Sequence, residues 1–321
     1  MKKLLFTIAA AILSAGLFAQ APSDSVLSES EVILKTPSGD ISGTLTIPST
    51  AKSSPIVLII AGSGPTDRDC NSAMGIRTNA YKLLAADLVK NGISSLRFDK
   101  RGIGKSRQAK TSESELRFET YIDDVVSWIS LLKADKRFSS ITILGHSEGS
   151  LIGMVAAERA PVAGFISISG AGKPIDKILR EQLQAKLPPL LLDESNRILD
   201  SLKAGKTVSN VNPSLATLYR PTVQPYMISW MRYDPTKEIG RLKIPVLIVQ
   251  GTTDLQVTVE DAKLLSASKP EAKLMIVENM NHVLKNSDSD LQKNMETYRN
   301  PDLPLKAELT AGIVDFVKGI K

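Results

Sequence analysis

The pentapeptide Gly-His-Ser-Glu-Gly at 145–149 is the part of this sequence best suited to chemistry. It follows a predicted buried strand at 141–144 and precedes a predicted helix at 150–159. In this strand–turn–helix setting, Gly-x-Ser-x-Gly forms a sharp turn that lifts the serine hydroxyl above the sheet. A Cβ at either glycine would clash with neighbouring backbone, and the helix dipole favours negative charge beside its first residues. Ser147 is therefore the candidate nucleophile.

A serine hydroxyl is a weak nucleophile at neutral pH and needs a general base. The chain has two histidines, and one of them, His146, adjoins the serine, where neighbouring side chains diverge. His282, in the loop after the last predicted strand, is the expected base. Asp254 follows the strand predicted at 246–250 and is expected to orient the imidazole and stabilise its charged form. Glu278 is the alternative acid.

Attack on a carbonyl group places negative charge on the former carbonyl oxygen, and two hydrogen-bond donors are needed there. The backbone N–H of Glu148, the residue after the nucleophile, is one expected donor. The glycine-rich turn at 61–64 follows another predicted strand, and the N–H of Ser63 is the expected second donor. The alternative interpretation of 61–64 is a plain tight turn.

Short apolar runs alternate with amphipathic helical patterns along most of the chain. This alternation predicts an α/β fold with a mainly parallel central sheet flanked by helices on both faces. The predicted strands lie at 41–47, 55–60, 94–98, 141–144, 164–169, 246–250 and 274–277, and the predicted helices at 79–91, 121–132, 150–159 and 305–320.

The segment at 173–243 is rich in helical patterns and proline and contains no convincing strand. We interpret it as a helical cap inserted over the carboxyl edge of the sheet, where open α/β sheets bind ligands. Met227, Trp230 and Met231 are candidate lining residues of a substrate pocket. The alternative is that they form a small core within the cap itself.

The first 19 residues have the three parts of a secretory signal peptide: a basic start, an apolar run at 4–18 and small residues after it. Cleavage is expected after Ala19 or, alternatively, Ala21. The apolar run is short for a bilayer span, so no stable membrane anchor is expected after cleavage. The chain is thus predicted to be periplasmic or secreted, with one α/β domain at 20–321.

Positive charge is concentrated in the predicted cap, which holds 12 lysines and arginines against 7 aspartates and glutamates. The basic residues are scattered without an aromatic-rich recognition motif, so nucleic acid is not an expected partner. A solvated surface is the simple interpretation, and a preference for anionic substrates is the alternative. The oligomeric state is not predicted.

No metal or cofactor is expected. The segment at 102–106 resembles the end of a phosphate-binding loop, but the position that requires glycine is Asp99, which excludes nucleotide binding of that kind. Cys70 is the only cysteine, so no internal disulfide forms.

The chain resembles bacterial carboxylesterases of the EstD type within the α/β-hydrolase superfamily. The resemblance runs from about residue 30 to the C-terminus, and its motifs lie at 61–69, 97–106, 145–149, 233–235, Asp254 and 281–282. The chain order serine, aspartate, histidine also matches the α/β-hydrolase fold. The resemblance implies esterase activity on simple acyl esters without a cofactor. This chain has Cys70 where the family pattern has glycine. Asp99 and Arg101 are interpreted as scaffold residues that hold loops around the site.

The predicted function is therefore a serine hydrolase that cleaves small carboxylic esters through an acyl-enzyme intermediate. A peptidase or amidase, a thioesterase or lactonase, and a non-catalytic binding protein on the same scaffold are the alternatives. The triad alone does not distinguish acyl leaving groups, and the natural ester and its acyl length are not predicted.

Overall fold

The computed structural model describes residues 27–49 and 52–320. The predicted signal peptide at 1–19 and both predicted cleavage sites lie outside these residues, so export stays a prediction. Among the described residues, no helix combines the length and apolar character needed to cross a membrane.

An eight-stranded sheet forms the centre of the protein, in the order β1-β2-β6-β3-β7-β8-β9-β10. The first two strands pair antiparallel, and β2 is also antiparallel to β6, while the other neighbours are parallel. A separate short hairpin consists of β4 and β5. The strand bounds are β1 (Leu27–Thr36), β2 (Gly39–Pro48), β3 (Ser54–Ile60), β4 (Asn71–Ser72), β5 (Ile76–Arg77), β6 (Ser94–Phe98), β7 (Phe138–His146), β8 (Gly164–Ile168), β9 (Val246–Gly251) and β10 (Lys273–Val277).

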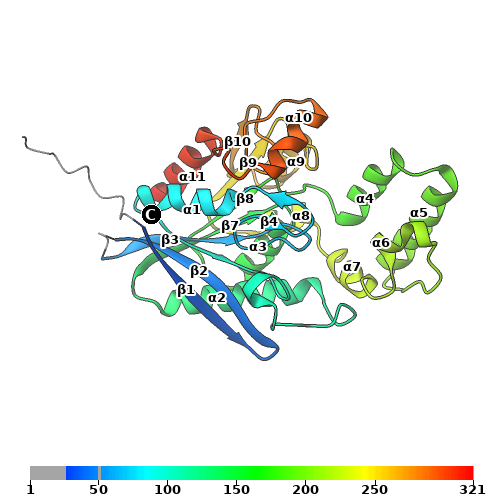
Figure 1. The fold of residues 1–321 in the computed structure, drawn as a ribbon, viewed down its shortest axis with the longest axis horizontal. Helices are drawn as coiled ribbons and strands as arrows, with labels where there is room; N and C mark the ends of the chain where they lie inside the picture. Colours follow the sequence, from blue (N-terminus) through cyan, green and yellow to red (C-terminus); the bar gives the residue numbers. More distant parts are fainter. Residues whose placement is uncertain (1–26, 50–51, 321) are drawn as a thin grey trace, which may run out of the picture.

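Helices cover both faces of the sheet (Figure 1). On one face lie α1 (Ala80–Lys90) and α11 (Ala307–Gly319), and on the other lie α2 (Phe118–Ala134), α3 (Glu148–Arg159), α8 (Pro235–Arg241) and α9 (Val259–Ser268). Strand β3 explains the arrangement, because Ile56 and Leu58 point into one core while Val57 and Ile59 point into the other. Such a strand must be buried on both faces, so its apolar run has no polar alternation.

The predicted cap segment lies between β8 and β9, and its described residues form helices joined by loops, with no strand. It contains α4 (Ile175–Gln184), α5 (Pro189–Lys203), η2 (Pro213–Leu215), α6 (Ala216–Tyr219) and α7 (Gln224–Trp230), followed by α8. In Figure 1, α4 to α7 form a lobe beside the sheet. This helical lobe has its own small core, which consists of Leu183, Ile198, Leu199, Leu202, Leu215, Tyr219, Met227 and Met231.

Strand β1 is the main element that the sequence patterns miss. It forms the antiparallel edge of the sheet. Its polar residues do not form a loop but contact residues that are distant in the sequence. The carboxylate of Glu29 accepts from Arg97 at 2.9 Å, and Glu31 accepts from Ser42 at 2.6 Å. These partners lie in other strands, so the ten residues of β1 do not by themselves indicate that the segment forms a strand. The remaining helical elements are η1 (Gly104–Ser106), α10 (Leu291–Glu296) and η3 (Thr297–Arg299).

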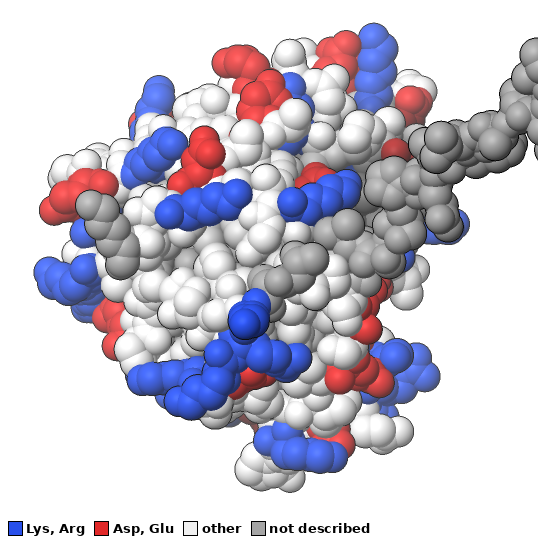
Figure 2. Space-filling view, turned by 90° about the vertical axis from the view of Figure 1, so that its left-hand side faces the viewer, with Lys and Arg blue, Asp and Glu red and all other residues white. Residues whose placement is uncertain are grey.

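Charged side chains on the face away from the helical lobe are of mixed sign, with several lysines and arginines gathered in its lower part (Figure 2). Within the lobe, the basic residues Lys173, Arg180 and Lys203 each pair with a carboxylate at 2.6–3.0 Å. These three basic residues are therefore paired with carboxylates of the same segment.

Candidate active site

Ser147 lies at the sharp turn between β7 and α3 with φ 56° and ψ −123°. A positive φ is rare for a residue with a side chain, and such strain persists only where the surroundings hold it in place. The N–H of Ser147 donates to the carbonyl of Ile168 at 2.9 Å, which ties the turn to β8. A Cβ at Gly145 would lie 2.2 Å from the carbonyl oxygen of Gly149, so the turn requires glycine there. The strained turn expected from the sequence is present.

Asp254 and His282, which are 28 residues apart, meet at the carboxyl ends of β9 and β10. Nδ1 of His282 donates to Oδ2 of Asp254 at 2.8 Å, and the side chains are 7 % and 0 % exposed. Oδ1 of Asp254 accepts from the N–H groups of Gln256 and Val257 at 2.8 and 3.0 Å. Burial acts to raise the pKa of Asp254, but the facing imidazole and these hydrogen bonds lower it to about 2. The carboxylate stays ionised and orients the ring.

Ser147 and His282 line one small cavity of about 70 Å³, together with Gly62 and Ser63. Among the described residues, no hydrogen bond joins the Ser147 hydroxyl to the His282 ring. Such hydrogen bonds are often long in ligand-free sites and shorten when substrate binds. The structure thus brings the predicted nucleophile and base into one cavity without the direct bond.

His146 has a structural environment that differs from that of His282. Its Nε2 lies 2.9 Å from the carbonyl oxygen of His282, and its Nδ1 lies 2.7 Å from the hydroxyl of Tyr81. A carbonyl only accepts, so Nε2 carries the proton and Nδ1 accepts from Tyr81. Burial lowers the pKa of His146 to about 3, which keeps the ring neutral. Both ring nitrogens are occupied, and His282 remains the available base.

The residues that carry the expected oxyanion donors lie near the nucleophile. Ser63 and Glu148 line a second, larger cavity of about 400 Å³ together with Ser147, and a Cβ at Gly62 would lie 3.0 Å from the Cβ of Ser147. Within the described part of the chain, neither the N–H of Ser63 nor that of Glu148 donates to a protein acceptor. Two unpaired N–H groups beside a strained serine suit a developing oxyanion.

Glu278, the alternative acid, contacts a different residue. Its Oε2 accepts from the hydroxyl of Thr252 at 3.2 Å on the exposed side of the β9–β10 edge. No hydrogen bond links it to His282 among the described residues. The imidazole is therefore bound to Asp254 and not to Glu278.

A cavity of about 400 Å³ extends from Ser147 into the helical lobe. Its walls are mostly apolar and include Ile175, Ile178 and Leu179 of α4, Leu218, Val223, and Met227 and Trp230 of α7. Two of the three candidate lining residues, Met227 and Trp230, thus line this cavity. Met231 does not, and lies in the core of the helical lobe instead.

A buried charged cluster beside the cavity was not found by the sequence analysis. Lys100, directly after Asp99, lies 3.8 Å from the carboxylate of Glu148, which accepts from the hydroxyl of Tyr226 on α7 at 2.7 Å. The sequence feature that could have indicated this cluster is a lysine only two residues after a buried strand, inside the motif at 97–106. Charged side chains in such positions need partners.

Asp99 and Arg101 make the contacts expected of scaffold residues. Asp99 accepts from the backbone and side chain of Arg68 at 2.8 and 2.7 Å. Arg101 pairs with Asp124 of α2 through two hydrogen bonds, and both side chains are buried. Neither residue lines the cavity at Ser147.

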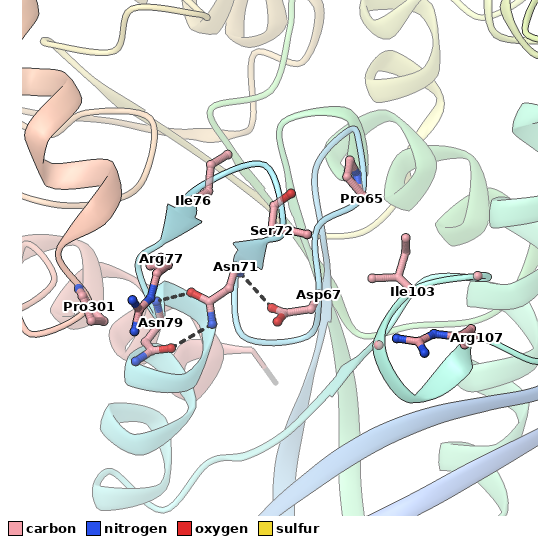
Figure 3. A pocket seen from close by; sticks show the side chains of 13 residues that line it. Pro65, Asp67, Asn71, Ser72, Ile76, Arg77, Asn79, Ile103, Arg107 and Pro301 are labelled. Carbon is pink, nitrogen blue, oxygen red and sulfur yellow. Dashed lines mark hydrogen bonds between the residues drawn. The ribbon is translucent and has the colours of Figure 1, made fainter.

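A second hollow of about 530 Å³ lies over the loop that contains Asp67 and Asn71 (Figure 3). Asn71 binds the carboxylate of Asp67 and the side chain and backbone of Asn79, as the dashed lines show. This hollow holds no serine–histidine pair. In the same loop, Cys70 has φ 70°, a left-handed conformation that favours glycine, so the backbone keeps the shape of a glycine at this position.

Across residues 27–49 and 52–320, no three or more histidine, cysteine, aspartate or glutamate side chains come together in a way that could hold a metal ion.

The mainly parallel sheet, the strained serine turn after a central strand and the helical lobe between β8 and β9 define the α/β-hydrolase fold. The Hydrolase_4 family, described as serine aminopeptidase, S33, matches residues 73–289, more than half of the sequence. The chain belongs to this family.

Similar proteins agree with this assignment. The chain is 28 % identical over 249 residues to esterase EstD of Thermotoga maritima, a match that covers 75 % of this chain and 57 % of that protein. The chain thus spans little more than half the length of this relative. Est1E of Butyrivibrio proteoclasticus has a TM-score of 0.57 at 16 % identity, covering 90 % of this chain and 99 % of that one. Esterase Pf2001 of Pyrococcus furiosus has a TM-score of 0.56 at 18 % identity, covering 93 % and 95 %. The predicted α/β-hydrolase fold is confirmed.

A substitution at Gly251 tests how the Asp254 and His282 loops are held together. A Cβ at this position would lie 1.9 Å from the carbonyl oxygen of Met280, two residues before His282. Gly251→Ala is expected to destabilise the fold by about 2–3 kcal/mol because the crowded backbone must shift. The activity of the folded fraction should also fall, since the shift moves the imidazole.

Urea unfolding and kcat/KM for an ester substrate check this prediction. Gly319→Ala is the matched control, because a Cβ there has no neighbour within 4 Å. It should leave both quantities within twofold or about 0.5 kcal/mol of the parent. Parental stability and activity in Gly251→Ala would contradict the packing argument.

Proposed function

We propose that this protein is a serine hydrolase that cleaves small carboxylic esters, with Ser147 as nucleophile, His282 as general base and Asp254 as the orienting acid. The observation that carries the proposal is the imidazole of His282, which is hydrogen-bonded to a buried carboxylate and lines the same cavity as the strained serine. The esterase names of the relatives support the same reaction class.

The proposed reaction has two halves. Oγ of Ser147 attacks the ester carbonyl carbon while Nε2 of His282 takes the hydroxyl proton, and the N–H groups of Ser63 and Glu148 bind the oxyanion. Collapse of the intermediate breaks the bond to the alcohol oxygen, which takes the proton from His282. Water activated by His282 then attacks the acyl-enzyme and releases the carboxylic acid.

The family description raises an aminopeptidase as an alternative, and the cavity lining argues against it. A substrate with a free α-ammonium group requires a carboxylate that is available to bind it. The one acidic residue in the described lining is Glu148, which is buried and already engaged by Tyr226 and Lys100. An ester without a nearby cation suits this lining better.

The basic residues at the cavity argue against a preference for anionic substrates. Lys173 is hydrogen-bonded to Glu181 at 2.7 and 2.8 Å, and Arg220 pairs with both carboxylate oxygens of Glu113. Each cation thus has its counter-charge in the protein. The remaining walls are mostly apolar, so we propose that the acyl group is neutral and apolar.

The test compares matched substrates on purified protein. We expect hydrolysis of p-nitrophenyl esters at least about 100-fold faster than that of the matching anilides, since amides have poorer leaving groups. A fluorophosphonate probe should label Ser147. Amide turnover equal to ester turnover would favour the peptidase alternative, and a protein that neither turns over esters nor reacts with the probe would favour the binding-protein alternative.

A substitution in the cavity wall tests the role of the helical lobe. Leu179→Trp on α4 fills part of the cavity, and kcat/KM for p-nitrophenyl octanoate is expected to fall about 10- to 100-fold relative to the acetate, because long acyl chains lose their space. Leu190→Trp is the matched control on the same lobe, since Leu190 is 83 % exposed and lies outside the cavity lining. An equal loss for acetate and octanoate would contradict the assignment of this cavity to the acyl chain.

Export to the periplasm or medium, after removal of residues 1–19 or 1–21, remains part of the proposal on the basis of the N-terminal sequence. Expression of the full chain in a Gram-negative host and N-terminal sequencing of the periplasmic fraction would test it. Recovery of the uncleaved chain in the cytoplasm would count against it.

A further inference from the structure

Lys100 is a buried lysine that the proposed reaction does not use. It lies two residues after β6, and 3 % of its surface is exposed. Lysine is rarely buried without partners, because its ammonium group loses strong hydration. Burial lowers the pKa of Lys100, and the charge of Glu148 opposes that shift. Burying Lys100 therefore costs free energy of hydration, and a functional contact of its ammonium group would explain why it is buried.

The ammonium group of Lys100 is hydrogen-bonded to the turn that carries one of the expected oxyanion donors. Nζ donates to the carbonyl oxygen of Gly62 at 2.5 Å. That oxygen belongs to the same peptide unit as the N–H of Ser63. A trans peptide is planar, and its C=O and N–H groups point in opposite directions. Holding the oxygen toward Lys100 therefore directs the N–H of Ser63 away from Lys100.

The charge of the lysine adds a second effect. A cationic donor forms a stronger hydrogen bond than a neutral one. Electron density drawn toward the carbonyl oxygen makes the N–H of the same peptide a better donor, as in any hydrogen-bonded chain. The N–H of Ser63 has no protein acceptor among the described residues, and Ser63 lines the cavity with Ser147.

The counter-charge of Lys100 lies on the other expected oxyanion donor. Oε2 of Glu148 is 3.8 Å from Nζ, and both side chains are 4 % exposed. Tyr226 of α7 donates to Oε1 of Glu148 at 2.7 Å, and the ring of Tyr121 lies 5.5 Å from Nζ. Lys100, Glu148 and Tyr226 thus form one buried cluster. Through it, the two turns that carry the expected oxyanion donors are connected to α7 of the helical lobe.

We propose that Lys100 is a positioning residue of the oxyanion hole: it orients and polarises the Gly62–Ser63 peptide so that the N–H of Ser63 binds the oxyanion. The inference rests on the proposed ester hydrolysis. Lys100 touches neither substrate nor the reacting atoms, and it acts through the peptide whose oxygen it holds.

The experiment compares Lys100→Met with the parent enzyme on a p-nitrophenyl ester and on a trifluoromethyl ketone, which forms a tetrahedral adduct with the serine. We expect kcat to fall about 10- to 100-fold with KM changed less than threefold, since the oxyanion forms only after binding. The inhibition constant of the ketone should rise by a similar factor. Lys100→Gln, which keeps a neutral donor, should recover part of both losses.

Arg101→Met is the matched control, because Arg101 is the adjacent buried cation and pairs with Asp124 away from Gly62. It should lower the melting temperature while kcat and ketone affinity remain within threefold of the parent at a temperature where the protein is folded.

The outcomes separate the inference from the proposed function. If the parent neither hydrolyses esters nor reacts with a fluorophosphonate, the proposed function fails. If the parent is active and the Lys100 variants keep parental kcat and ketone affinity, or lose them no more than Arg101→Met, the positioning role is overturned. Should Lys100→Met not fold, Lys100→Gln is judged by the same two ratios.

Discussion

Replacing Ser147 with alanine is expected to reduce kcat for ester hydrolysis by about 10⁴- to 10⁶-fold while the protein stays folded. The hydroxyl is the proposed nucleophile, and Ser63, the other serine in the described cavity linings, does not lie at the strained turn between β7 and α3. The substitution also removes fluorophosphonate labelling. The remaining rate should come from the oxyanion donors and from binding alone.

His282→Ala is expected to cost nearly as much as Ser147→Ala, and the double variant little more than either one, because the two groups act in the same step. Circular dichroism and urea unfolding establish that each variant is folded, and kcat is measured on p-nitrophenyl acetate. If Ser147→Ala retained more than about 1 % of the parental kcat, the nucleophile would be a different group. Cys70 is a poor substitute, since burial raises the pKa of its thiol to about 11.

The second large effect is expected for Asp254→Asn, which should lower kcat by about 10⁴-fold. Oδ2 of Asp254 accepts from the His282 ring and also lies 3.2 Å from the amide nitrogen of Gln250. Both partners donate to this oxygen. An asparagine NH₂ group in its place would face two donors, so the ring would change tautomer or turn away.

Glu278→Gln is the matched control for this prediction. It removes the alternative acid, which binds Thr252 and not the imidazole, and it should leave kcat within twofold. Activities are compared at one pH on the same ester. A large loss in Glu278→Gln together with a small loss in Asp254→Asn would reverse the assignment of the acid.

The Asp254 carboxyl also contributes to acid stability, and the sign follows from its pKa. The pKa is about 2 in the folded protein, against about 3.9 in an unfolded chain. A lowered carboxyl pKa stabilises the fold above about pH 4, and this contribution is lost as the pH falls toward 2. The stability difference between the parent and Asp254→Asn should therefore shrink over that interval.

Local sequence was sufficient to predict an element where the residues that determine its structure lie within one short segment. The turn at 145–149 is an example, because the strand, the crowded glycine and the strained Ser147 lie within a few residues of one another. The buried strand β3 is another, since a strand covered on both faces is apolar throughout. Strand β1 could not be predicted in this way, because its polar side chains pair with Arg97 and Ser42 in other strands.

The candidate base and acid could be named from the sequence partly because the chain has so few histidines. Their meeting at 2.8 Å is a property of the tertiary structure, as is the engagement of His146 by Tyr81 and by the His282 carbonyl. The pocket shows the limit of the approach. Met227 lies in α7 and Met231 is the residue that directly follows this helix, yet only Met227 lines the cavity.

The sequence by itself determined the α/β-hydrolase fold, the serine turn and the identity of the residues proposed for the triad. Each depends on residue types and spacings that remain visible in one dimension. Only the tertiary structure decided which carboxylate binds the imidazole, which lobe residues face the cavity, and that Lys100 contacts the Gly62 carbonyl from 38 residues away. These contacts join segments that pack together only after the sheet and the helical lobe have formed, and no local pattern encodes such a distance.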